Sequence, residues 1–183
     1  GSLILVFGTA TLSILLGVSS AWLVACCKFP GRKFFEWALI LPLAIPTYIA
    51  AYSYFDLLDK LNPLLIWIRL NISTEVMILM SDVIVYPMTI IVLASVLYPY
   101  VYLVARAAFT QQSNQFIEAA RTLGHGPHST FWRTALPLAR PAIVGGVSLV
   151  IMETLNDYGA VKHFNIPTFT TGIFRTWLSI GDL

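Results

Sequence analysis

The sequence predicts an all-α membrane protein, a polytopic bundle of about four transmembrane helices. Of its 183 residues, 57% are hydrophobic and only 11% are charged, whereas charged residues make up about a quarter of a typical soluble domain. Four apolar stretches are candidate membrane spans, and no run of like charges is long enough to hold a nucleic-acid backbone. The predicted spans are residues 3–25, 37–58, 83–108 and 141–155.

The first predicted span, residues 3–25, contains no charged residue. At about 1.5 Å per residue it is long enough to cross a hydrocarbon core of roughly 30 Å. No basic segment precedes it, and the bulky Trp22 lies near its end. These features favour a membrane helix over a cleaved signal peptide.

Prolines are expected to bend the second and third spans. Pro42 and Pro46 lie one turn apart in the second span, and Pro87 and Pro99 interrupt the third. Each proline removes a backbone hydrogen bond. A membrane tolerates such bends where neighbouring helices or a wet cavity satisfy the freed carbonyls.

The fourth predicted span, residues 141–155, carries Gly145 and Gly146, which allow close helix contact. Basic residues set the orientation of all four spans, because they are more frequent on the cytoplasmic side. Their density places residues 115–137 in the cytoplasm and residues 156–183 in the periplasm. The denser group is Lys28, Arg32, Lys33, Arg106, Arg121, Arg133 and Arg140, and the sparser group is Lys60, Arg69, Lys162 and Arg175.

The cytoplasmic segment 115–137 reads as a helix-turn-helix elbow. A first short helix over residues 115–123 is stopped by Gly124, and Gly126-Pro127 forms a turn. A second short helix is expected from about His128, with a break at Pro137.

This elbow resembles the EAA loop of the permeases of ABC importers. The matching residues, which keep the spacing of that loop, are Glu118, Ala119, Ala120, Gly124, Leu136 and Pro137. Thr134 departs from the pattern, which prefers Ile there. The resemblance implies that these six residues couple the chain to cytoplasmic ATPase subunits. The chain has no Walker A pattern, so those partners would hold ATP and Mg. The chain itself is therefore expected to bind no cofactor and not to be an enzyme.

Further segments look like permeases of the iron(III) ABC importer family. They are residues 35–48, 97–102, 152–159 and 166–173, the last of which includes Pro-Thr-Phe-Thr-Thr-Gly. The resemblance implies a multi-pass protein of the bacterial inner membrane that moves ferric iron. It also implies two partners, a periplasmic binding protein and a second permease bundle in the same or another chain. In that family a further membrane helix follows the Pro-Thr-Phe-Thr-Thr-Gly segment. Residues 1–183 are therefore expected to be a fragment of a single transmembrane domain.

Glu153 and Asp157 are candidates for the substrate path. They are four residues apart, share a face if the helix persists, and carry the hard oxygens that suit Fe³⁺. The equally weighted alternative is that they are solvated or hydrogen-bond the turn at residues 156–159. His125 and His128 lack a third ligand nearby and are expected to be solvated, so no metal site is predicted with certainty.

Three other functions are alternatives to ferric iron import. Permeases for thiamine, polyamines and sulfate share the EAA loop and are the first alternative. An ion-coupled secondary transporter would use bent helices and membrane-edge carboxylates equally well, but it has no use for the elbow. An intramembrane hydrolase is disfavoured because all three histidines lie outside the apolar spans.

Overall fold

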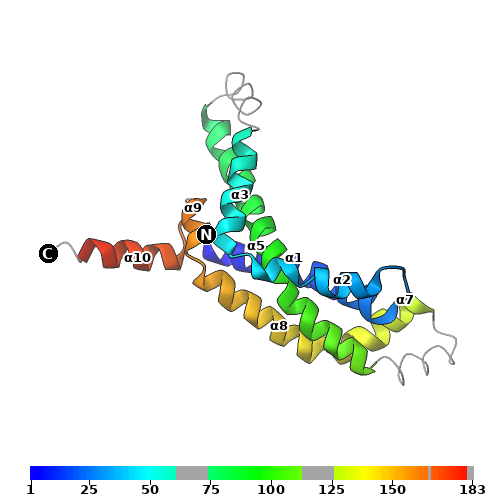
Figure 1. Cartoon of the computed structure of the whole chain (residues 1–183). Helices are drawn as coiled ribbons and strands as arrows, with labels where there is room; N and C mark the ends of the chain where they lie inside the picture. Colours follow the sequence, from blue (N-terminus) through cyan, green and yellow to red (C-terminus); the bar gives the residue numbers. More distant parts are fainter. Residues whose placement is uncertain (61–73, 113–125, 165, 181–183) are drawn as a thin grey trace.

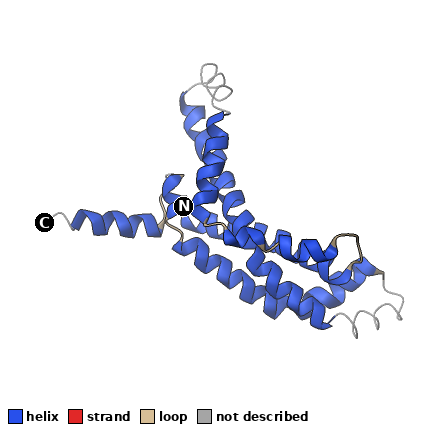
Figure 2. Cartoon of the chain, in the orientation of Figure 1, coloured by secondary structure: helices blue, strands red, loops and turns tan. Residues whose placement is uncertain are grey.

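The computed structural model describes residues 1–60, 74–112, 126–164 and 166–180. Every regular element in these ranges is helical (Figures 1 and 2), so the predicted all-α class is confirmed. The elements are α1 (Ser2–Cys26), α2 (Arg32–Ala38), the 3-10 helix η1 (Leu41–Ala44), α3 (Thr47–Lys60), α5 (Thr74–Gln112), α7 (Pro127–Thr130), the π-helix η2 (Phe131–Ala135), α8 (Leu136–Asn156), α9 (Gly159–His163) and α10 (Phe169–Ile180).

Helices α1, α5 and α8 pack side by side and form the bundle (Figure 1). Their facing side chains are fully buried, whereas large apolar side chains on their outer faces are exposed. In a bilayer the outer faces contact lipid tails, so their exposure is expected. Residues Ser2–Cys26, Val85–Gln111 and Phe131–Asn156 are each long and apolar enough to cross a membrane. Buried examples are Leu5, Ala21, Val92, Val101 and Val150, and exposed ones are Leu3, Phe7, Leu15, Val144 and Leu149.

The second predicted span is broken rather than simply bent. Residues 32–44, which cover α2 and η1, meet residues 47–54 of α3 at 89°. Ile45 between them is extended, with φ −92° and ψ 119°. The cause is Pro46, because the ring of a proline disfavours the helical conformation in the residue before it. If the bent pair is one span, the described residues contain four candidate spans.

The third predicted span belongs to a longer helix. α5 runs from Thr74 to Gln112 with Pro87 and Pro99 inside it. Its first part lies beside α3 and rises away from the bundle, while its second part packs between α1 and α8 (Figure 1). The two prolines therefore do not end the helix.

Two glycines bring α1 and α8 against the same point of α5. A Cβ atom on Gly17 would lie 2.8 Å from Val101 Cβ, and one on Gly146 would lie 3.0 Å from Val101 Cα and 2.6 Å from Val104 Cγ2. Neither contact leaves room for a side chain. Gly145 faces open space, with nothing within 4 Å of a Cβ placed there. Of the adjacent glycines predicted to allow close contact, only Gly146 makes one.

We expect Gly146→Ala to lower the thermal stability of the protein, because overpacking a tight contact costs about 1–3 kcal/mol. Gly145→Ala is the matched control, and replacing a helical glycine by alanine there should be neutral or stabilising by about 0.5–1 kcal/mol. The measurement is thermal unfolding in detergent. Equal destabilisation by both changes would show that the α5–α8 contact is not the cause.

Candidate functional site: the elbow and its base

The structure describes the second half of the predicted elbow. Glu118, Ala119, Ala120 and Gly124 lie outside the described residues, so their coupling role stays a prediction. Leu136 and its neighbour Pro137 form the first turn of α8.

The break predicted at Pro137 is wrong. α7, η2 and α8 follow one another without an interruption, so that residues 127–156 form one helical run. In its π-turn the Leu136 N–H donates to the carbonyl of Phe131, five residues earlier. A wide turn of this kind relieves the clash between a proline ring and the carbonyl four residues before it, here that of Arg133. The elbow's second helix is thus continuous with the fourth span.

An aromatic cluster joins this run to the other two bundle helices. The Trp22 ring of α1 lies edge-on to Phe109 of α5, with ring centroids 5.4 Å apart, and its centroid is 4.9 Å from that of Phe131 in η2. Phe109 is only 1% exposed. Thr130, also buried, donates its hydroxyl to the Gly126 carbonyl at 3.0 Å. The cluster places the base of the elbow in direct contact with α1 and α5.

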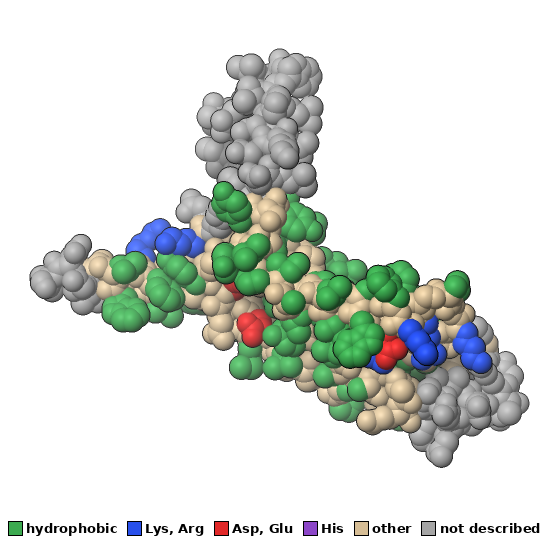
Figure 3. Space-filling model, viewed as in Figure 1, with side chains coloured by type: hydrophobic (Ala, Val, Ile, Leu, Met, Phe, Trp, Pro, Cys, Tyr) green, Lys and Arg blue, Asp and Glu red, His purple; other side chains and the backbone are tan. Residues whose placement is uncertain are grey.

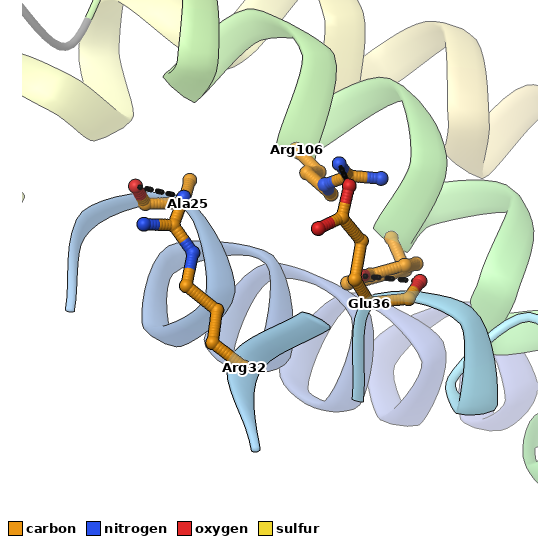
Figure 4. Close-up of polar contacts among 5 residues, drawn as sticks. Ala25, Arg32, Glu36 and Arg106 are labelled. Atoms are coloured by element: carbon orange, nitrogen blue, oxygen red, sulfur yellow. Dashed lines mark hydrogen bonds and ion pairs between the residues drawn. The ribbon is translucent and has the colours of Figure 1, made fainter. Parts of the chain in front are cut away.

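A second set of contacts ties α2 to α5 and α1 (Figure 4). The Arg106 guanidinium donates to the Glu36 carboxylate in an ion pair whose side chains are 27% and 28% exposed. The Tyr102 hydroxyl donates to the Glu36 backbone carbonyl at 3.2 Å, and Arg32 donates to the Ala25 carbonyl at the same distance. Pairing offsets part of the cost of holding the Glu36 and Arg106 charges away from water.

Sequence reasoning missed both sets of contacts. Tyr102 and Arg106 are four residues apart on a predicted helix, a spacing that places them on one face. That spacing could have indicated a shared partner, but nothing in the sequence identifies it as Glu36, 70 residues from Arg106. No sequence pattern indicates the aromatic cluster, because its three rings come from three separate segments.

At the opposite end of the bundle, the two candidate carboxylates have different surroundings. α8 ends at Asn156, so Glu153 and Asp157 do not share one helix. The Asp157 Oδ1 accepts the backbone N–H of Ala160 at 2.8 Å and so caps the start of α9. Glu153 is exposed and interacts electrostatically with Tyr100 of α5. A substrate-path role stays a prediction for both.

The Pro-Thr-Phe-Thr-Thr-Gly segment caps the start of α10. The Thr168 N–H donates to the Thr171 hydroxyl at 2.8 Å, and the Thr171 N–H donates to the Thr168 hydroxyl at 3.3 Å. This reciprocal pair is a capping box that starts α10. The Phe169 N–H donates to the hydroxyl of Ser2 at 3.0 Å, which ties α10 to the first turn of α1.

Among the described side chains, no three His, Cys, Asp or Glu residues gather as metal ligands. His125 and the side chain of His128 lie outside the described residues, so their predicted solvation stays a prediction.

We expect Arg106→Gln to destabilise the protein by about 1–2 kcal/mol, because hydrogen bonds to charged groups are worth about that much when partly shielded from water. Arg140→Gln, an exposed arginine on α8, is the control and should change little. Thermal unfolding of both variants, of Glu36→Gln, and of Arg106→Gln combined with Glu36→Gln measures the coupling between the two side chains. Additive losses in the double variant would contradict a direct interaction.

Residues 5–173 match the family described as "Binding-protein-dependent transport system inner membrane component". The Fe(3+)-transport system permease protein FbpB 2 of Haemophilus influenzae is 30% identical over 165 residues, which cover 90% of this chain and 28% of that protein. A probable sulfate transport system permease protein cysT of Chlorokybus atmophyticus is 30% identical over 82% of this chain and 51% of its own length. The molybdenum transport system permease protein ModB of Escherichia coli is 28% identical over 88% of this chain and 69% of its own length.

The chain thus spans between 28% and 69% of the length of these three relatives. The family match covers the bundle, the elbow and the segment that caps α10. The chain belongs to the family of inner-membrane components of binding-protein-dependent transport systems.

Proposed function

We propose that this chain is the membrane domain of an ATP-driven importer that receives ferric iron from a periplasmic binding protein. Its family supports the importer part of the proposal, and the iron-transport relative supports the substrate. ATP hydrolysis is assigned to a separate cytoplasmic ATPase, with a second permease bundle completing the path.

The observation that carries the proposal is the continuous helical run from the elbow to the far end of the bundle. Residues 127–156 contain no break, and Phe131 near their start contacts Trp22. A displacement of the elbow by an ATPase would therefore move α8 as one body. The aromatic cluster would pass part of this motion to α1 and α5, which is what alternating access between two faces of a membrane requires.

The substrate is the finer part of the proposal. The relatives named for sulfate and molybdenum transport favour the alternative that another small solute is carried. Glu153 supports iron in this proposal, since an exposed carboxylate beside the α5–α8 contact attracts a cation and repels an oxyanion.

We expect Glu118→Lys and Gly124→Asp to leave the permease inserted while uncoupling uptake from ATP hydrolysis. The first change reverses the charge proposed to face the ATPase, and the second would strain the helix end that the sequence predicts at Gly124 by about 1 kcal/mol. The measurement is uptake per ATP hydrolysed in proteoliposomes. Gln111→Lys, an exposed position at the end of α5, is the control for added charge. Wild-type coupling in both test variants would contradict the role of the elbow.

We expect Glu153→Gln to lower ferric uptake severalfold, because it removes a charge and keeps the side chain's size. Asp157→Asn should have a smaller effect, since asparagine also caps helices. ATPase stimulation by the loaded binding protein should persist in both. The matched comparison is uptake at equal membrane levels of each variant. Unchanged ferric uptake in Glu153→Gln would remove this residue from the substrate path.

A further inference from the structure

Two hydroxyl groups lie inside the bundle without a hydrogen-bond partner. Apolar side chains are spread over the visible outer face of the bundle (Figure 3), whereas Thr9 and Ser13 of α1 are buried inside it, with 0% of each residue exposed. Neither the Thr9 Oγ1 nor the Ser13 Oγ makes a hydrogen bond with the described residues. A buried hydroxyl without a partner is unfavourable, so each of these two needs a physical reason.

Other hydroxyls of the same helix are paired within it. Thr11, Ser19 and Ser20 each donate to the backbone carbonyl four residues earlier in α1. This is the common bond of a serine or threonine inside a helix. Ser13 does not make it, so its hydroxyl is available to an acceptor on a neighbouring helix.

A proline in α5 creates such an acceptor. Pro99 lies inside the helix and is fully buried. Because proline has no backbone N–H, the Ser95 carbonyl lacks the donor that an α-helix normally supplies four residues later. In membrane proteins, serine and threonine side chains of neighbouring helices are among the groups that satisfy carbonyls freed in this way.

Close contacts show that α1 and α5 run in the same direction. A Cβ atom on Gly8 would clash with Ile90 Cδ1, and one on Gly17 would lie 3.0 Å from the Tyr98 carbonyl oxygen. Residue numbers therefore increase together along the two helices. One turn along α1 corresponds to about one turn along α5.

This register places Ser13 at the level of the freed carbonyl. Ser13 lies one turn before Gly17 and shares its helix face. The Ser95 carbonyl lies about one turn before the Tyr98 carbonyl, which is the one that Gly17 meets. The unpaired donor of α1 and the freed acceptor of α5 are thus neighbours across one helix contact.

We propose that α5 adopts a second bend at Pro99, in which the Ser13 hydroxyl donates to the Ser95 carbonyl. In the structure this hydrogen bond is not made. The bend is adjustable, because no hydrogen bond joins the Ser95 carbonyl to Pro99. Val101 is held against α1 and α8, so the part of α5 before Pro99 is the part that moves. The proposal concerns the bundle alone and does not depend on the proposed transport function.

The bend is measured as the distance between two spin labels on α5, one on each side of Pro99. Ile91→Cys and Ala107→Cys carry the labels, since Ile91 is 51% exposed and Ala107 is exposed as well. The two positions are about 24 Å apart in a straight helix, a separation that pulsed electron paramagnetic resonance resolves. The protein is the full-length permease in detergent, with its native cysteines replaced by alanine. We expect two distances, one for each bend.

Ser13→Ala removes the donor and should lower the population of the second bend about fivefold, the ratio that corresponds to a hydrogen bond of about 1 kcal/mol. Pro99→Ala restores an N–H for the Ser95 carbonyl and should give one distance. Adding Ser13→Ala to Pro99→Ala should then change nothing.

Thr9→Val is the matched control. Its hydroxyl is also buried and unpaired, but it lies one turn farther from Gly17. The other proline inside α5, Pro87, frees the carbonyl of residue 83, which lies well beyond that level. Thr9→Val should therefore keep both distances in the proportions of the unsubstituted protein.

Three results would overturn the proposal. A single distance in the protein with Ser13 and Pro99 intact would show that α5 has one bend. Unchanged populations in Ser13→Ala would show that this hydroxyl stabilises neither bend. An equal loss of the second bend in Thr9→Val would indicate a general effect of removing a buried hydroxyl. None of these measurements requires transport.

Discussion

The close approach of three helices at Val101 is the constraint on which the rest of the structure depends. Gly17 of α1 and Gly146 of α8 both meet this residue of α5, and neither has room for a Cβ atom. An apolar side chain gains little by moving from lipid tails into the protein interior. Close backbone contact of this kind is therefore what holds membrane helices together. The aromatic cluster at one end and the α9–α10 region at the other are positioned by the helices that this contact joins.

The second constraint is the continuity of α8 with the elbow. A proline at the start of a membrane helix usually marks its boundary, yet the π-turn at Phe131–Ala135 carries the helix past Pro137. The base of the elbow is therefore part of the fourth span and packs on Trp22. Under the proposed function, a displacement of the elbow would move the fourth span without a separate linker.

The sequence predicted those features that depend on local chemistry. A charge-free stretch was enough to find α1, and Pro42 and Pro46 were enough to predict a bend in the second span, although not a break of 89°. Features that depend on tertiary contact were not found. The Glu36–Arg106 pair joins distant segments. The helix continues past Pro137 through the π-turn at Phe131–Ala135, which no sequence pattern predicts. The cap made by Asp157 is local, and a hydrogen bond from this carboxylate to the following turn was one of the two alternatives that the sequence offered.

The energy source is the most direct test of the central claim that this chain serves an ATP-driven importer. The full-length permease, its ATPase and its binding protein are reconstituted in proteoliposomes, and uptake is measured with ATP on the ATPase side or with an imposed proton or sodium gradient. The account predicts uptake that requires ATP, the ATPase and the loaded binding protein, with none driven by a gradient alone. Gradient-driven uptake by the permease without the ATPase would contradict it and would indicate a secondary transporter.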